Sequence, residues 1–455
     1  MEPQRRESTK FMLETWLDFY SVMEEHPQIK RLLFDPVTGL PTTPLLFPRI
    51  KSLLEERGEV SMLCINVARY SRIEEIFGWQ AFDTVMQEVA AVLDEITGEV
   101  LRDSDVLAEL MISGNAFVIV LSPPRTQACI DPSARVVLAR RVERSIREKL
   151  EARMDPALYK KFGCYVGAAT ACADGGVRIE RLVYDCLEQA LEDSYDREES
   201  DAQERITRLR DILVNERIRT LVHAVFDLET MEVIGYEALS RGPEGSEFER
   251  PDKLFGIAYG ADLVMRLERV CRKRALEAAT EMPEGRLLFL NIEPEAVSDP
   301  QLRDMVTQTL LSAPAIAPSS VVLEITERSA ITDFAAFRST LEFVRALGYS
   351  VAVDDAGAGY GSLQCLAEVT PEWLKVDLSL VRGVDTDSVR ATLIESLVTF
   401  ADRVGARLIA EGIETEAELG RLRELGVRYG QGFLLATPCE PFPAEADLPA
   451  KQLVR

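Results

Sequence analysis

The sequence has only two histidines, and its eight cysteines are scattered without any Cys-x-x-Cys pair. This combination offers too few nitrogen and sulfur ligands at the spacing of a zinc site. The simplest interpretation of the cysteines is a set of free, buried thiols in a reducing compartment.

Long hydrophobic runs are also absent. No segment approaches the ~18 apolar residues of a membrane-spanning helix, and the start of the chain is polar, without the apolar stretch of a secretion signal. We therefore expect a cytoplasmic protein without a membrane span.

Basic residues are too few to balance the acidic ones. The 52 Lys and Arg residues stand against 76 Asp and Glu, which gives a formal net charge of -24. The phosphates of nucleic acids require basic surface, so no nucleic acid partner is expected. If a chain this acidic acts on a phosphate ester, divalent cations are the expected mediators.

The sequence does contain enough apolar residues for a core, with 47% hydrophobic and 28% charged residues among 455. This length predicts at least two domains. Changes of pattern divide the chain into an amphipathic helix over residues 1–30, a domain over 31–197, a charged linker helix over 198–216 and a second domain over 217–445.

The amino-terminal helix is predicted from Met12, Trp16, Phe19 and Met23, which share one helical stripe. The stripe is too short to form a coiled coil of its own. It is expected either to dock on the next domain or to contact a second copy of the chain in a homodimer.

The domain over 31–197 mixes apolar strands with amphipathic helices, which predicts an α+β fold. Expected strands cover 61–67, 116–121 and 165–170, and expected helices cover 81–96 and 179–191.

Beyond Ile218, short apolar runs alternate with helical patterns. Expected strands cover 287–291, 321–325, 350–353, 373–376 and 408–410, with helices over 334–347 and 389–404. Regular alternation predicts a parallel sheet, and this many units in about 230 residues favours a closed, TIM-like β/α barrel over an open sheet.

Polar residues stand at the ends of these strands, namely Asn291, Glu324, Asp354, Asp355, Lys375, Asp377 and Glu411. The carboxyl ends of barrel strands converge on one face, so these side chains would form a negative cup that requires cations. Their oxygen ligands suit two Mg²⁺ or Mn²⁺ ions, an arrangement that hydrolyses phosphodiesters. The alternative is that they only cap strands and helices.

Seven segments in order resemble the motifs of bacterial EAL domains, which hydrolyse cyclic diguanylate. They are Glu237-Ala238-Leu239, Asn291-Ile292-Glu293-Pro294, Glu324-Ile325-Thr326-Glu327, Asp354-Asp355-Ala356-Gly357, Lys375-Val376-Asp377, Ala410-Glu411-Gly412-Ile413-Glu414 and Gly430-Gln431-Gly432-Phe433. The resemblance implies cyclic diguanylate as the substrate and the linear dinucleotide pGpG as the product.

The same resemblance implies two metal sites and a set of catalytic residues. The first ion would be held by Glu237, Asn291, Glu324 and Asp354, and the second by Asp354, Asp355 and Glu411. Lys375 would orient or deprotonate the attacking water, with Glu237 and Glu411 also in catalytic positions.

Substrate contacts are implied for Arg241, Asp377 and Gln431, and Glu327 and Glu414 resemble loop-stabilising residues. The sequence departs from the family pattern at Ala356, where Phe is common, and at Leu221-Val222-His223-Ala224, which replaces the usual stretch ending in Gln-Pro. His223 can donate to a guanine or a phosphate; the alternative is a buried, hydrogen-bonded histidine.

The segment Asp35–Pro41 resembles the opening of GGDEF domains, which join two GTP molecules into cyclic diguanylate. Where that family has a metal-binding Asp, this chain has Asn66, and the name motif is replaced within Met111–Ala116. The acidic groups are missing, so we expect no cyclase activity. GTP binding without turnover stays open.

Arg102 and Asp105 match the Arg-x-x-Asp pattern of an inhibitory site for cyclic diguanylate; the alternative is a solvated loop. The amino-terminal domain is therefore expected to be regulatory. Two other interpretations of the whole chain compete with the enzyme. One is a weak or inactive module that binds cyclic diguanylate or GTP and signals through a protein partner, and the other is a scaffold.

Overall fold

The computed structural model describes residues 33–67, 78–110, 115–122, 130–159, 162–293, 316–325, 334–356, 369–440, 442–443 and 448, except for the side chains of residues 157, 334–336, 355 and 356. The helix predicted over 1–30 lies outside these ranges. The chain divides into two compact units, Met1–Glu204 and Arg205–Arg455. None of the described helices has the length and hydrophobicity needed to cross a membrane.

The first unit contains an antiparallel sheet in the order β2-β3-β1-β4. The strands are β1 (Glu59–Val67), β2 (Val106–Leu110), β3 (Ala116–Leu121) and β4 (Cys164–Cys172). The three strands predicted from the sequence correspond to β1, β3 and β4. The prediction missed β2.

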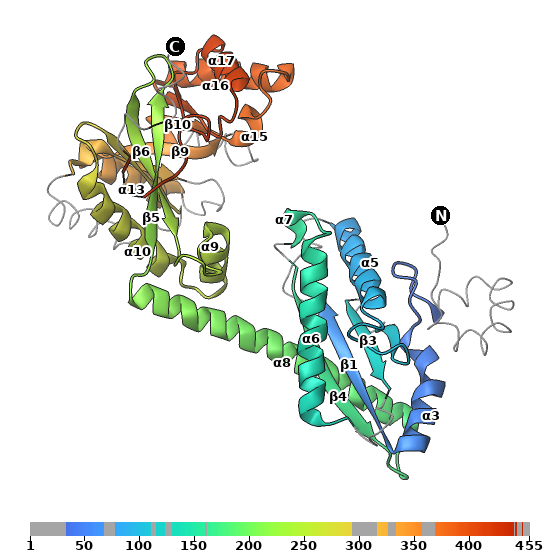
Figure 1. Ribbon diagram of the computed structural model, residues 1–455. Helices are drawn as coiled ribbons and strands as arrows, with labels where there is room; N and C mark the ends of the chain where they lie inside the picture. Colours follow the sequence, from blue (N-terminus) through green and yellow to red (C-terminus); the bar gives the residue numbers. More distant parts are fainter. Residues whose placement is uncertain are drawn as a thin grey trace. The chain divides into compact units, whose positions relative to one another are not determined.

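Helices cover both faces of this sheet (Figure 1). One face carries α5 (Trp79–Glu95) and α6 (Pro132–Glu151), and the short α7 (Pro156–Tyr159) follows α6. The other carries η2 (Thr43–Leu46), α3 (Phe47–Arg57) and α8 (Ile179–Val214). Successive β1 side chains point to opposite faces, so Leu63 and Ile65 join one core while Met62 and Cys64 join the other.

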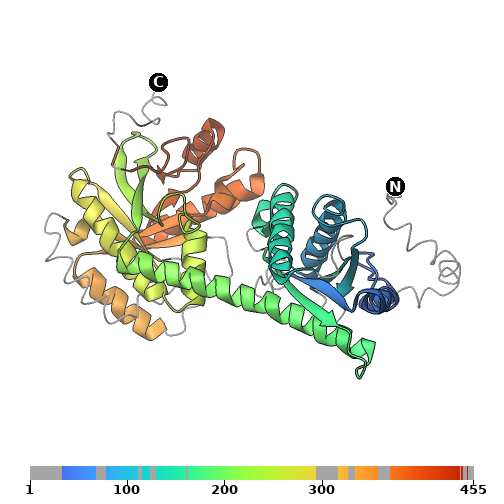
Figure 2. The same cartoon turned by 60° about the horizontal axis from the view of Figure 1, so that its bottom comes forward.

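Helix α8 runs through 36 residues without a break, as Figure 2 shows. The sequence analysis placed two separate helices here, at 179–191 and 198–216. Neither glycine nor proline interrupts the charged residues between them, so the helix continues. The two compact units meet in sequence within α8, between Glu204 and Arg205.

The second unit is a closed barrel with the strand order β10-β11-β12-β5-β6-β7-β8-β9. The strands are β5 (Arg219–Asp227), β6 (Val233–Arg241), β7 (Leu287–Ile292), β8 (Val321–Ile325), β9 (Ser350–Ala356), β10 (Trp373–Val376), β11 (Arg407–Ala410) and β12 (Tyr429–Gly430). The predicted TIM-like barrel preceded by an α+β domain is confirmed.

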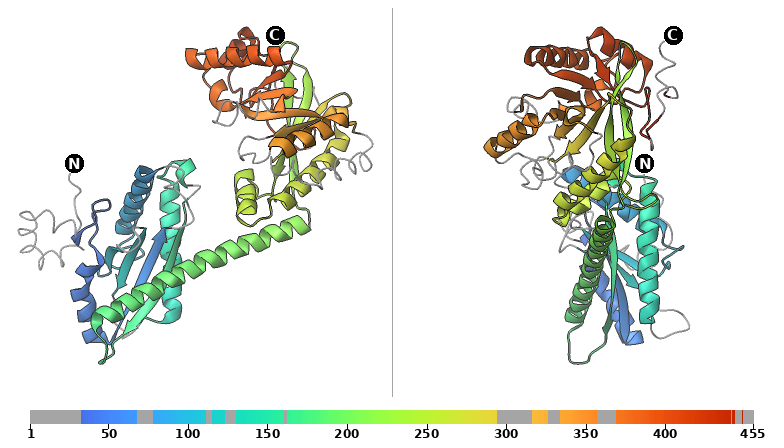
Figure 3. Two further views of the ribbon diagram at one scale, coloured as in Figure 1. Left: turned by 180° about the vertical axis from the view of Figure 1, so that it is seen from behind. Right: turned by 90° about the vertical axis from the view of Figure 1, so that its left-hand side faces the viewer.

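Helices surround the barrel, as the two views of Figure 3 show. They are α9 (Pro251–Gly260), α10 (Val264–Ala278), η4 (Ala279–Glu281), η5 (Pro318–Ser320), α13 (Phe334–Ala346), α15 (Leu378–Val381), α16 (Ser388–Val404) and α17 (Glu416–Glu424). Local signals set their starts: Asp387 caps α16, and Thr415 with Glu418 forms a capping box on α17.

The expectation of a uniformly parallel sheet is wrong for β5, which is antiparallel to both β6 and β12. A short turn between β5 and β6 explains this, because a parallel pair needs a longer crossover. The Asp227 carboxylate accepts the N–H groups of Glu229 and Thr230, and Met231 takes a left-handed conformation with φ 56°.

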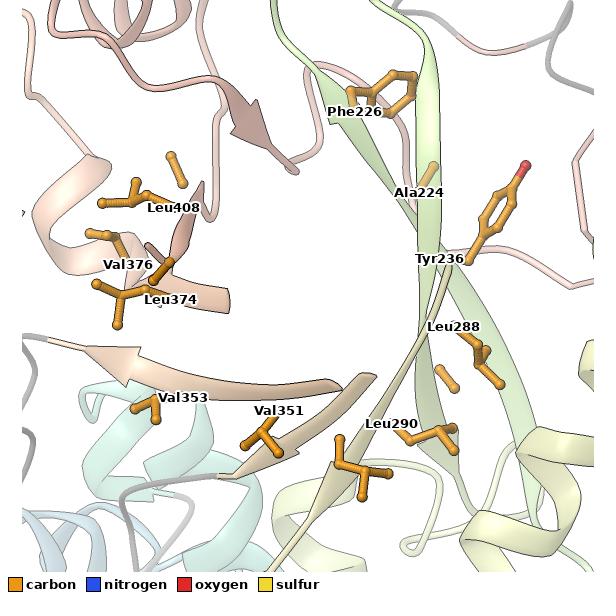
Figure 4. Packing of buried hydrophobic residues seen from close by; sticks show 14 of the residues in the cluster. Ala224, Phe226, Tyr236, Leu288, Leu290, Val351, Val353, Leu374, Val376 and Leu408 are labelled. Atoms are coloured by element: carbon orange, nitrogen blue, oxygen red, sulfur yellow. The ribbon is translucent and has the colours of Figure 1, made fainter. Parts of the chain in front are cut away.

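Alternation along the strands separates two apolar clusters. Inside the barrel lie Val225, Phe289, Val322, Ala352, Trp373 and Ile409. The alternate residues point outward toward the helices; Figure 4 shows Leu288, Leu290, Val351, Val353, Leu374 and Val376 on the outer side of their strands. This period of two determines which polar residues face the barrel axis.

Candidate active site

Beyond the interior apolar residues, polar side chains occupy the next inward-facing positions toward one end of the barrel. Asn291, Glu324, Asp354, Lys375 and Glu411 each stand two residues after an interior apolar residue. A step of two keeps a side chain on the same face of a strand and moves it toward the carboxyl end. These five of the seven predicted strand-end residues therefore meet at the carboxyl face of the barrel.

Lys375 is the centre of this cluster. Its side chain is fully buried, and its Nζ lies 2.6 Å from Glu411 Oε1 and 3.0 Å from Glu324 Oε1. The same Nζ lies 3.3 Å from Glu237 Oε2 and 3.6 Å from Asp354 Oδ1. Four carboxylates from β6, β8, β9 and the end of β11 thus surround one ammonium group.

Two amides connect Glu237 to its neighbours. Asn291 Nδ2 donates to Glu237 Oε1 at 3.1 Å, and Gln431 Nε2 donates to Glu237 Oε2 at 2.7 Å. Gln431 Nε2 also lies 2.9 Å from Glu411 Oε1. These contacts hold both carboxylate oxygens of Glu237, so side chains from β7 and from the end of β12 fix its position.

For Glu237 and Lys375, nearby opposite charge shifts the pKa more than burial does. Burial would raise the pKa of Glu237, but the Lys375 ammonium and the two amide donors hold it at about 2. Burial would lower the pKa of Lys375, but the surrounding carboxylates hold it well above its usual value. Both groups are therefore charged near neutral pH.

Glu324 and Glu411 instead have raised pKa values, because four carboxylates share one ammonium group. Burial raises the pKa of Glu411 to about 8, and Lys375 offsets only part of that effect. Burial also raises the pKa of Glu324, and the neighbouring carboxylates add to the shift. The cluster therefore has more carboxyl groups than its own positive charge can balance.

The donor set fits a hard divalent cation. Apart from their ion pairs with Lys375, both carboxylate oxygens of Glu324 and Oδ1 of Asp354 are buried without a hydrogen-bond partner among the described residues. Buried oxygens without donors are costly, and Mg²⁺ or Mn²⁺ prefers carboxylate and amide oxygens. A cation would satisfy these atoms.

In this arrangement, however, the four carboxylates form ion pairs with the Lys375 ammonium. Within the described residues, no group of three or more His, Cys, Asp and Glu side chains is arranged to hold a metal ion. Metal binding thus requires the carboxylates to move away from the ammonium, or ligands beyond the described atoms, such as the side chain of Asp355. The assignment of individual metal ligands stays a prediction.

Two predicted substrate residues border the cluster. Arg241 ends β6, and its Nη1 donates to the Ser240 carbonyl at 2.9 Å. His223 pairs in register with Glu237, and its Nε2 lies 3.1 Å from the Ala436 carbonyl. Burial lowers the pKa of His223. This is the environment of the buried, hydrogen-bonded histidine that the sequence left as an alternative.

The remaining predicted site residues either make contacts away from the Lys375 cluster or lie outside the described residues. Asp377 caps α15 by accepting the Ser379 N–H at 2.9 Å, and Glu414 pairs with Arg382 at 2.6 Å. Neither is among the carboxylates within 4 Å of Lys375. Glu327 lies outside the described residues.

In the first unit, Asn66 stands where the resemblance implies a metal-binding Asp, and its side chain belongs to a hydrogen-bond network with Asn115 and the Glu198 carboxylate. Asn66 is fully buried at the end of β1, and its Nδ2 donates to Glu198 of α8 at 3.2 Å. Asn115 Nδ2 lies 3.4 Å from Asn66 Oδ1 and donates to the Val67 carbonyl at 3.1 Å. These contacts link β1, β3 and α8.

Arg102 and Asp105, the predicted inhibitory site for cyclic diguanylate, form hydrogen bonds within their own loop and with Ser122. Asp105 accepts the N–H groups of Arg102 and Ser122 at 2.9 and 2.6 Å. Arg102 Nη1 donates to the Ser122 carbonyl at 2.5 Å. Both side chains therefore hold the loop before β2 against the end of β3, and binding of cyclic diguanylate by this pair stays a prediction.

One feature beside the cluster was missed by the sequence analysis. Glu268 and Arg272, one turn apart on α10, form a buried ion pair with 2.5 Å between Glu268 Oε2 and Arg272 Nη1. Both line a cavity that also reaches Arg241 and Asn291. The sequence did contain a signal for this ion pair, because opposite charges four residues apart stand on the same helix face as Leu267 and Cys271.

Comparison with known proteins agrees with this architecture. The EAL domain family model matches residues 206–438, and the diguanylate cyclase GGDEF domain model matches residues 32–198. Among solved structures, the Xanthomonas citri FimX EAL domain in complex with c-diGMP has a TM-score of 0.50 at 24% identity. It covers 55% of this chain and 98% of that domain, and the similarity concerns the fold.

Two relatives come from Pseudomonas aeruginosa. The bifunctional diguanylate cyclase/cyclic di-GMP phosphodiesterase MucR is 26% identical over 439 residues, which cover 92% of this chain and 61% of MucR. The cyclic di-GMP phosphodiesterase RocR is 35% identical over 187 residues, which cover 41% of this chain and 45% of RocR. The chain thus matches less than two thirds of the length of either relative. Since the EAL model matches more than half of the chain, the protein belongs to the EAL domain family, with a GGDEF domain ahead of its EAL domain.

Proposed function

We propose that the EAL domain hydrolyses cyclic diguanylate to the linear dinucleotide pGpG and that the GGDEF domain regulates it without making cyclic diguanylate. The observation that carries this proposal is the buried Lys375 with four carboxylates within 4 Å at the carboxyl ends of the barrel strands. The phosphodiesterase names of MucR and RocR support the choice of substrate.

In this proposal two Mg²⁺ or Mn²⁺ ions bind at the cluster. Glu237, Asn291, Glu324 and Asp354 would hold one ion, and Asp354, Asp355 and Glu411 would hold the other. When bound, the ions supply the positive charge that activates water and stabilises the leaving oxygen.

The chain's own groups position the reactants. Water adds across one P–O bond of the ring, which leaves a phosphate monoester on one nucleotide and a free hydroxyl on the other. Lys375 orients the attacking water, Gln431 keeps Glu237 and Glu411 in place, and Arg241 binds a phosphate oxygen. Asp377 is a further substrate contact, and Glu327 and Glu414 support the loops.

The direct test is incubation of the protein with cyclic diguanylate and Mg²⁺ or Mn²⁺, followed by chromatography. We expect pGpG to accumulate, EDTA to stop the reaction, and Ca²⁺ not to restore it, because Ca²⁺ takes longer and looser coordination. Binding of cyclic diguanylate without hydrolysis in either metal would instead support the signalling module that acts through a partner.

The GGDEF domain is expected to make no cyclic diguanylate from GTP. Joining two GTP molecules needs metal to neutralise the triphosphates and a group that activates the attacking hydroxyl. Asn66 itself offers no carboxylate for this task, and the neighbouring Glu198 carboxylate accepts the Asn66 Nδ2. Labelled GTP should be followed with Glu237→Ala protein, so that hydrolysis cannot hide synthesis. Labelled cyclic product would refute this prediction, whereas an effect of GTP on hydrolysis by wild-type protein would support regulation.

A further inference from the structure

One face of α8 lies directly on the backbone of β4. A Cβ atom on Gly167 would stand 2.0 Å from the Ala190 carbonyl oxygen and 2.5 Å from the Ser194 nitrogen, so only glycine fits there. One turn further along the helix, Arg197 Nη1 donates to the Val166 carbonyl at 2.5 Å. Contacts this close leave no space between the helix and the sheet, so the first unit holds this part of α8 firmly.

Glu198 is the last buried side chain of α8 within the first unit. It is 6% exposed, whereas residues 199–204 are all exposed. Asn66 of β1 is fully buried and donates from Nδ2 to Glu198 Oε2 at 3.2 Å. A buried carboxylate that loses a hydrogen-bond donor costs free energy, because water cannot replace the donor. The hold of the first unit on this end of the helix therefore depends on the amide at position 66.

The other end of α8 belongs to the core of the second unit. Leu209, Ile212 and Leu213 pack in one apolar cluster with residues of α9 and α10. Residues of the same two helices line the cavity beside the carboxylate cluster. Helix α8 is continuous from Ile179 to Val214. Because a continuous helix is a rigid element, a change in how the first unit holds it is transmitted to α9 and α10.

We propose that Asn66 and Glu198 are positioning residues, whose contact fixes α8 on the first unit and thereby sets the position of α9 and α10 beside the carboxylate cluster. An aspartate at position 66 would bring a second carboxylate against Glu198 and repel it. The amide that removes a metal ligand is therefore also the group that makes this contact possible. The inference rests on the proposed function and names the contact through which the GGDEF domain acts on hydrolysis.

The test uses Asn66→Leu in the full chain, which keeps the branched shape of the side chain but removes the donor to Glu198. We expect hydrogen exchange of the backbone amides over 190–204 to become about 10- to 100-fold faster, because a buried acceptor has lost its donor. KM for cyclic diguanylate should rise about 2- to 30-fold, with a smaller change in kcat, since the Lys375 cluster itself is untouched. The double variant Asn66→Leu with Glu198→Met makes both partners apolar and should restore the exchange rates and KM.

The matched control is Asn215→Leu. Asn215 Nδ2 also donates to a carboxylate of α8, at 2.7 Å from Asp211 Oδ1, but both of these side chains are exposed. This variant should keep the wild-type exchange rates over 190–204 and the wild-type KM. If Asn66→Leu does not fold, Glu198→Met alone breaks the same contact from the side of the helix, and faster exchange with a raised KM is expected there as well.

The two measurements distinguish a failure of this inference from a failure of the proposed function. Unchanged exchange in folded Asn66→Leu protein would show that the contact does not anchor α8, and faster exchange with an unchanged KM would show that the anchor does not act on the second unit. Either result would overturn the inference and leave hydrolysis standing. If wild-type protein binds cyclic diguanylate without hydrolysing it, the enzyme proposal is wrong, but a weaker Kd in Asn66→Leu that the double variant restores would still support the inference.

Discussion

Glu237→Ala protein is expected to hydrolyse cyclic diguanylate at least about 100-fold more slowly than wild type, since metal ions supply several kcal/mol to such reactions. Glu237 contacts Asn291, Gln431 and Lys375, so its loss removes a proposed ligand and the acceptor that holds two other side chains. The fold should survive, because removal of one carboxylate relieves repulsion among the four around Lys375.

Rates of pGpG formation at saturating Mn²⁺ and a thermal unfolding curve would measure both parts of this expectation. Glu232→Ala is a suitable control, because Glu232 is an exposed glutamate just before β6. It should behave like wild type. Hydrolysis by Glu237→Ala within tenfold of the wild-type rate would refute the proposed role of Glu237.

Lys375→Met protein is expected to lose hydrolysis by about 100-fold or more and to lose about 3 to 5 kcal/mol of unfolding free energy in EDTA. The substitution keeps a long side chain but leaves four buried carboxyl groups without their ammonium partner. Saturating Mn²⁺ should restore much of the stability, since a bound cation replaces the missing charge, but it should not restore turnover.

The control for this experiment is Lys273→Met. Lys273 Nζ lies 2.6 Å from Glu216 Oε2, as short as the Lys375–Glu411 contact, but both side chains are solvent-accessible. Exposed pairs of this kind contribute at most about 1 kcal/mol. Equal stability of the two variants in EDTA would show that the Lys375 cluster does not depend on its ammonium group.

Local patterns predicted most of the barrel strands because their apolar runs are short and bounded. Strands β8 and β10 have the bounds expected from the sequence, and β7 and β11 each differ by one residue. The antiparallel β5 was not predicted, since its direction depends on the turn at Asp227 and on pairing with β12, which lies some 200 residues later in the chain.

Strand β2 and helix α6 of the first unit were not predicted from the sequence, for different reasons. Strand β2 contains Glu109, which interrupts the apolar run; its burial is explained by Thr38, whose hydroxyl donates to Glu109 Oε2 at 2.7 Å from a distant segment. Helix α6 could have been found, because Ala139, Val142, Ile146 and Leu150 form a regular buried stripe.

The sequence by itself determined which polar residues stand at the ends of the barrel strands. This was possible because the apolar runs that predict the strands are short and bounded, and because the carboxyl ends of barrel strands converge. It did not reveal that Lys375 is the centre of the cluster, or that Glu268 and Arg272 line a cavity beside it. Those facts depend on how strands and helices pack, because burial and charge balance arise only when residues far apart in the chain come into contact.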